Sequence, residues 1–156
     1  MESDLDNTDF IKYVDKELGF QIEHPSGWNV KSFSPSGQMD SFQPIIAFMS
    51  PEANFVFGAF ETTKPISTTE LVNMELSYMK KQFDGFMAHK ITKLNDNDVR
   101  VMYQYIQEGM NLFAAQSFHK QTERITYSFI GTTEQSKAAQ YIPIFVHMLE
   151  SVRFTS

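Results

Sequence analysis

The stretch DKELGFQIEHPSGW, residues 15–28, decides the fold that this sequence predicts. Apolar residues alternate with small or polar ones over residues 18–23, which is the period of a strand with one buried face. Pro25 ends that strand, because proline donates no hydrogen bond to a ladder, and a Pro-x-Gly step is typical of a turn. We therefore expect two strands joined by a proline corner, with Phe20 and Trp28 as neighbours in the interior. Five residues are interpreted as anchors of the fold: Gly19, Phe20, Pro25, Gly27 and Trp28.

The composition indicates a globular chain with a substantial core. Of its 156 residues, 42% are apolar and 14% are aromatic, and a chain of this length is typical of one domain. Residues 1–9 are mostly polar and include several acidic side chains, so we expect them to form a disordered tail. Residues 10–156 are expected to form a single domain.

The net charge and the absence of cysteine exclude several classes of function. A formal net charge of −6 argues against nucleic-acid binding, which needs a basic surface. The chain contains no cysteine, which excludes disulfides, thiol catalysis and cysteine-ligated zinc. No apolar run reaches the length of about 18 residues that a membrane-spanning helix needs, so we expect no transmembrane segment in this chain.

Strands and a helix are predicted in the first half of the chain. Residues 45–49 and 54–61 are predicted as buried strands, the second with apolar residues on both faces. Residues 67–70 match a capping box that starts a helix over 68–83, and we expect Asp84 and Gly85 to end it. Its apolar face is predicted to comprise Leu71, Val72, Met74, Leu76, Tyr78, Met79 and Phe83.

The second half of the chain predicts an antiparallel meander followed by a helix. Strands are predicted at 89–94, 99–106, 112–120 and 124–131, joined by short links. Thr132 or Thr133 is expected to cap a last helix, which Pro143 interrupts, and residues 152–154 are expected to form a short edge strand. The predicted fold class is α+β, with an antiparallel sheet of about six or seven strands and helices packed on both faces.

The order of these motifs resembles the PsbP/Mog1 superfamily. The resemblance is carried by YxDxxxGFxxxxPxGW at residues 13–28, NFxF at 54–57, the capped helix, the meander, and a last helix that closes on LESVRF at 149–154. It covers residues 13–154. The resemblance implies an antiparallel sheet with helices on both faces, which agrees with the pattern of the residues.

The resemblance implies binding to a protein rather than catalysis. Plant members stabilise the oxygen-evolving centre, and the yeast-type relative binds a small GTPase. Many prokaryotic members are exported or lipid-anchored proteins with no assigned activity, and this chain resembles those most. We expect a non-enzymatic protein-interaction module with a protein partner, exported or at a membrane surface rather than cytoplasmic. The alternative is a carrier domain that binds a small ligand or a metal.

No sequence motif marks a nucleophile or a cofactor site. The dinucleotide fingerprint, the phosphate-binding loop and the GxSxG elbow are all absent from the sequence. A Ser–His–Asp site made of distant residues stays open, because its members need not be close in sequence. We expect no cofactor and assign no catalytic residue.

The histidines are interpreted mainly as structural or solvated residues. His24 is expected to bond to local backbone in the turn, while His89 and His119 are expected at the surface. His147 and Glu150 are three residues apart on the last helix and share a face. They are the candidates for a metal site, which needs further convergent donors; the alternative is an exposed pair at a helix end.

The aromatic residues of two predicted strands allow two interpretations. Phe55, Phe57 and Phe60 lie on one strand, and Tyr103 and Tyr105 lie on another. They could line a pocket, but core packing is favoured because aromatic side chains dominate ordinary cores.

Overall fold

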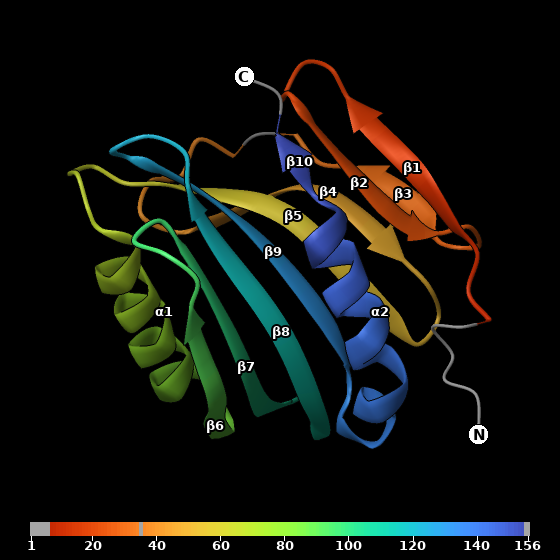
Figure 1. The fold of residues 1–156 in the computed structure, drawn as a ribbon. Coiled ribbons are helices and arrows are strands. Elements are labelled where there is room, and N and C mark those ends of the chain that lie inside the picture. The colour runs from red at the N-terminus through yellow and green to blue at the C-terminus, as the bar shows by residue number, and fades with distance from the viewer. Residues whose placement is uncertain (1–6, 35, 155–156) are drawn as a thin grey trace.

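The computed structural model describes residues 7–34 and 36–154. Its described strands form a seven-stranded sheet in the order β3-β4-β5-β9-β8-β7-β6 and a three-stranded sheet in the order β1-β2-β10 (Figure 1). Most of the expected acidic tail, residues 1–6, lies outside the described residues. The elements are β1 (Phe10–Asp15), β2 (Phe20–Pro25), β3 (Asn29–Ser32), β4 (Phe42–Met49), β5 (Ala53–Glu61), α1 (Thr68–Gln82), β6 (Asp84–Lys93), β7 (Asp98–Gln107), β8 (Met110–Lys120), β9 (Ile125–Glu134), a 3-10 helix (Gln135–Lys137), α2 (Ala138–Ser151) and β10 (Arg153–Phe154).

The predicted antiparallel sheet and its two helices are confirmed. Each strand pairing in the described part of the chain is antiparallel. β6, β7, β8 and β9 follow one another in both sequence and space, so the meander extends over four strands. The chain is therefore an α+β protein built on one large antiparallel sheet. No described helix has the length and apolar character needed to cross a membrane.

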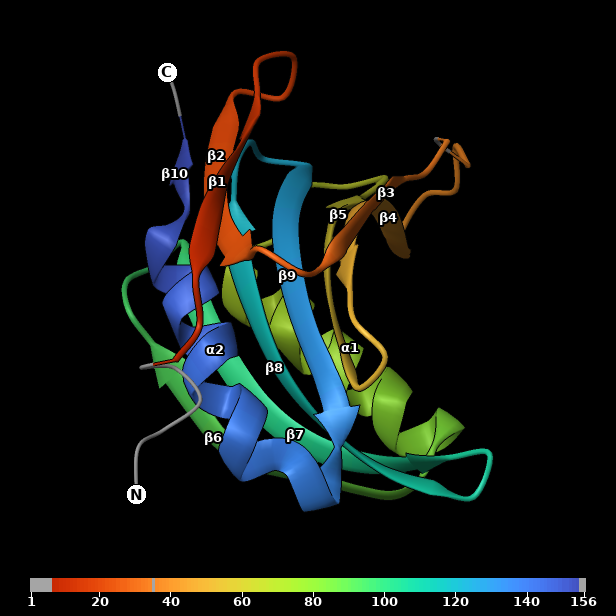
Figure 2. The ribbon, with the colours of Figure 1, turned by 90° about the vertical axis from the view of Figure 1, so that its right-hand side faces the viewer.

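The proline corner joins two strands, as expected, but the two strands belong to different sheets. β2 pairs with β1 and β10, while β3 pairs with β4 at the edge of the large sheet (Figure 2). Phe20 is 1% exposed, and its ring centroid lies 4.5 Å from that of Phe57. Trp28 is half-buried, and its ring centroid lies 6.4 Å from the ring centroid of Tyr141. A period of two shows which face of a strand is buried but not which strand is its neighbour.

The other expected anchor residues occupy different environments. Pro25 is buried at the end of β2, where its carbonyl accepts a hydrogen bond from the amide of Trp28 at 3.1 Å. Gly19 has a φ of 73°, a left-handed conformation that favours glycine. Gly27 is exposed, and a Cβ added there meets nothing within 4 Å.

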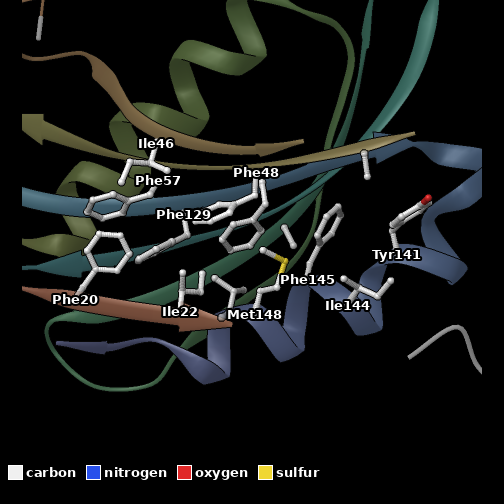
Figure 3. Packing of buried hydrophobic residues seen from close by; sticks show 14 residues of the cluster. Phe20, Ile22, Ile46, Phe48, Phe57, Phe129, Tyr141, Ile144, Phe145 and Met148 are labelled. Atoms are coloured by element: carbon white, nitrogen blue, oxygen red, sulfur yellow. The ribbon is translucent and has the colours of Figure 1, made fainter. Parts of the chain in front are cut away.

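The larger core cluster lies between α2, β2 and one face of the large sheet. Figure 3 shows the rings of Phe20, Phe57 and Phe129 at one end and Phe145 of α2 further along. Phe55, Phe57 and Phe145 are each 0% exposed. The aromatic residues of β5 therefore pack in the core instead of lining a pocket.

α1 packs over a second cluster with β6, β7 and β8. Leu71, Val72 and Met79 are buried there, as expected. Met74 and Tyr78 were expected on the same face but are 55% and 54% exposed. Helical spacing alone made the predicted face too broad, because α1 contacts the sheet along a narrower stripe.

The ends of both helices differ from the sequence-based expectation. Thr132 and Thr133 lie in β9 and cap no helix; the Thr133 hydroxyl donates to the carbonyl of Glu52 at 2.9 Å. The high β-propensity of threonine explains why the strand continues through both residues. α1 ends at Gln82, and Asp84 already begins β6.

Candidate functional site

A groove runs beside α2 over the strands β6, β7 and β8. It consists of two adjoining cavities of about 350 Å³ and about 230 Å³ that share Leu94, Arg100 and Leu149. We call it the α2–β6 groove. The larger cavity is lined by Leu94, Asp98, Val99, Arg100, Ser117, Phe118, His119, Phe129, Leu149, Glu150, Val152, Arg153 and Phe154. The smaller one is lined by Lys90, Thr92, Leu94, Arg100, Val101, Met102, Ala115, Gln116, Val146 and Leu149.

The floor of the groove is apolar. Met102 of β7 and Ala115 of β8 are cross-strand partners, so they lie side by side on one face of the sheet. Val146 and Leu149 are three residues apart on α2 and line the facing wall. Leu94 follows β6 and is 52% exposed. Ala115 and Leu149 are buried, so the apolar surface that faces solvent beside α2 comes from Leu94 and the partly exposed Met102 and Val146.

Charged side chains cross the middle of the groove and stand at both ends. The guanidinium of Arg100 on β7 lies 4.0 Å from a carboxylate oxygen of Glu150 on α2. Lys90 lines only the smaller cavity and Arg153 only the larger one. With Asp98 included, the lining carries three basic and two acidic side chains, in a chain whose net charge is −6. The groove is thus locally cationic on an acidic protein.

His119 closes one end of the groove. Its Nδ1 lies 2.5 Å from Asp98 Oδ1, and its ring stacks on Phe154 with centroids 4.7 Å apart. The ring contact between His119 and Phe154 connects β10 to the large sheet. Ser117 lines the same cavity, but among the described residues it makes no hydrogen bond to His119, as the nucleophile of a catalytic triad would.

The two candidate metal ligands have different partners. His147 Nε2 lies 2.9 Å from Glu23 Oε1, and its ring stacks on Phe10 at 3.9 Å. Glu150 faces Arg100 across the groove. Among the described residues, no group of three or more histidine or carboxylate side chains converges. A metal site at His147 and Glu150 stays a prediction without a third donor.

The remaining histidines take structural places. His24 is buried, with Nδ1 donating to the Pro25 carbonyl at 2.9 Å and its ring 4.9 Å from that of Phe48. It thus bonds to local backbone, although it lies in β2 instead of the turn. His89 is exposed, with Nε2 2.5 Å from Gln104 Oε1.

A cluster at the other end of α2 fixes that helix to the sheet. Tyr141 donates to Glu52 Oε1 at 2.8 Å, and Lys137 pairs with the same carboxylate. The hydrogen bonds from Lys137 and Tyr141 lower the pKa of Glu52. Because each member of this cluster is partnered, the cluster is structural.

Sequence reasoning assigned no role to Arg100, Lys90 or Leu94. For Arg100 the signal was the alternation over 99–106, which places Arg100 and Met102 on one strand face, a charge beside an apolar residue. Lys90 and Leu94 lie outside that segment. The opposing wall comes from α2, almost fifty residues later in the chain. The groove exists only once the fold has brought these segments together.

Solved structures with the same architecture were found by comparison. Cyanobacterial PsbP from Synechocystis sp. PCC 6803 matches with a TM-score of 0.69 and 12% identity, covering 95% of this chain and 94% of that one. The Ran-binding protein Mog1p of Saccharomyces cerevisiae matches with a TM-score of 0.66 and 6% identity, covering 94% and 96%. This chain has the PsbP/Mog1 fold.

A third structure with the PsbP/Mog1 fold has no known function. It comes from Pseudomonas aeruginosa and matches with a TM-score of 0.64 and 20% identity, covering 94% of this chain and 98% of that one. No family model and no curated protein matches the sequence. The expected resemblance is confirmed as a fold, and at these identities it carries no function by itself.

Proposed function

We propose that this chain is a non-enzymatic protein-interaction module that binds its partner in the α2–β6 groove. The observation that carries the proposal is the apolar lining formed by Met102 on the floor and Val146 on the wall, both partly exposed, beside the exposed Leu94. An exposed apolar surface with a polar rim is typical of a protein-binding site. Mog1p, which shares the fold, is a Ran-binding protein, and this supports a protein partner.

We further propose that α1 and α2 cover opposite faces of the large sheet in one domain over residues 10–156. Along β8, Ala114 belongs to the cluster with α1 and Ala115 to the cluster with α2, and successive strand residues point to opposite faces. Figure 2, in which α2 lies in front of β8 and α1 behind it, supports this arrangement. α2 packs on β8 and β9, which leaves its flank toward β6 as the wall of the groove.

Affinity capture with matched variants tests the proposal. The wild-type chain, Leu94→Glu in the groove and Val30→Glu on β3 are immobilised and exposed to extract of the native cell. Leu94 and Val30 are 52% and 43% exposed, so neither change is expected to unfold the protein; melting curves check this. A protein retained by the wild type and by Val30→Glu but lost from Leu94→Glu is the expected result. Equal retention by all three chains, or turnover of a small substrate without any retained protein, would overturn the proposal.

A further inference from the structure

We infer that the α2–β6 groove accepts a peptide segment of the partner that combines acidic with apolar side chains. The inference deepens the proposed function and rests on it. It follows from where the basic residues stand along the groove, from how the acidic ones are engaged, and from the concave shape of the site.

The basic residues are spread along the groove. Lys90 borders the smaller cavity, Arg153 borders the larger cavity, and Arg100 borders both. The apolar floor lies between them. A segment that lies along this floor therefore passes a cation near each end and one in the middle. Acidic side chains at these places match the potential of the groove.

The acidic residues of the lining are already engaged or easily displaced. Asp98 is held by His119 at 2.5 Å. Glu150 is 64% exposed at its side chain and lies 4.0 Å from Arg100, the distance of a loose pair in solvent. A partner carboxylate that reaches Arg100 would form a closer, two-pronged contact. Arg100 is thus available to an incoming acidic segment. Arg153 Nη1 already donates to the carbonyls of Glu150 and Val152 at 2.7 and 2.8 Å, so Arg153 can bind a carboxylate only through its other N–H groups.

A second copy of the chain fits the groove less well than a peptide segment. A symmetric dimer would place the same concave surface on both molecules, and two facing grooves leave each other unfilled. Two copies with a net charge of −6 each also repel one another. An extended or helical segment of a different protein fills a concave site without either cost.

Selection from a random peptide library displayed on phage tests the inference with the full chain. We expect enriched peptides with net negative charge and several apolar residues. In fluorescence anisotropy, Lys90→Glu is expected to weaken their binding by about tenfold. The matched control Lys93→Glu reverses the same charge on the same strand, outside the groove lining, and is expected to change binding by less than about twofold. Replacing only the acidic residue of the peptide that lies against position 90 by lysine should restore binding to Lys90→Glu, because Arg100 and Arg153 still need acidic partners.

The outcomes separate this inference from the proposed function. Enriched peptides that are neutral or basic, yet lose binding on Leu94→Glu, overturn the acidic specificity and leave the groove as the interaction site. Peptides that bind Leu94→Glu as well as the wild type overturn both. A library that yields no enriched peptide overturns the inference, and the affinity capture then decides the proposed function alone.

Discussion

Gly131 lies in β9 directly against the ring of Phe145 in α2. A Cβ added at Gly131 would meet ring atoms of Phe145 at 2.5–2.8 Å, closer than nonbonded carbon atoms approach. The absence of a side chain at Gly131 therefore allows α2 to pack closely on the sheet. α2 in turn forms one wall of the groove. At this scale a single missing side chain fixes the position of an element.

Gly131→Ala is expected to lower the free energy of unfolding by about 1–3 kcal/mol, the usual cost of overpacking a core. Urea unfolding measures the loss. Gly27→Ala is the matched control, because a Cβ at Gly27 meets nothing within 4 Å, and it should change stability by less than about 0.5 kcal/mol. Equal effects of the two changes would contradict the account of Gly131.

Tyr103 belongs to a buried hydrogen-bonded chain under α1. Its hydroxyl donates to Gln116 at 2.8 Å, and Gln116 donates to Ser128 at 3.0 Å. Burial raises the pKa of Tyr103 above its ordinary value of 10.0, and the charges of Tyr105 and Glu75 add to the rise. The neutral phenol is therefore the form that the folded state holds.

Tyr103→Phe is expected to cost about 1–3 kcal/mol at neutral pH, because the buried oxygen of Gln116 loses its donor. The pKa of Tyr103 is higher in the folded state than in the unfolded state. The contribution of its neutral hydroxyl to the free energy of unfolding is therefore fully present below pH 10.0 and is lost as the pH rises further. The stability gap between wild type and variant should therefore narrow above about pH 10. Urea unfolding over a pH series measures the gap, and a constant gap would argue against a buried neutral phenol.

At the scale of elements, the sequence predicted most strands but not all of their neighbours. The alternation over 18–23 correctly placed Phe20 in the core, yet β2 proved to belong to a second sheet. Local patterns specify burial and turns, whereas pairing depends on contacts between distant segments. α2 illustrates the same limit, because Thr132 and Thr133 are good caps in isolation but continue β9 in the fold.

The start of α1 is an element that local sequence does determine. The Ser67 hydroxyl accepts from the amide of Glu70 at 3.1 Å, and Glu70 accepts from the amide of Ser67 at 3.4 Å. Ser67→Ala is expected to cost about 1 kcal/mol in urea unfolding. Ser77→Ala, on the exposed face of the same helix, is the control and should be neutral or slightly stabilising. A neutral Ser67→Ala would show that packing alone fixes the helix start.

At the scale of the whole molecule, the fold was predictable and the groove was not. The motifs at 13–28 and 149–154 pointed to the PsbP/Mog1 fold, which the structural comparisons confirm. The groove forms because Lys90 and Leu94 lie beside β7 while α2 leaves this part of the sheet uncovered. No local sequence pattern encodes the position of α2 on the sheet. The net charge of −6 likewise conceals a cationic site, because composition averages over the surface.

The most direct test of the account is hydrogen–deuterium exchange of the full chain, with and without the captured protein or a selected peptide. This measurement reports the binding surface without assuming its position. We expect slower exchange confined to residues 90–102, to residues 115–119, and to the second half of α2 with β10. Slower exchange around the exposed Met74 and Tyr78 of α1, or on β1 and β3, with the groove unchanged, would contradict it.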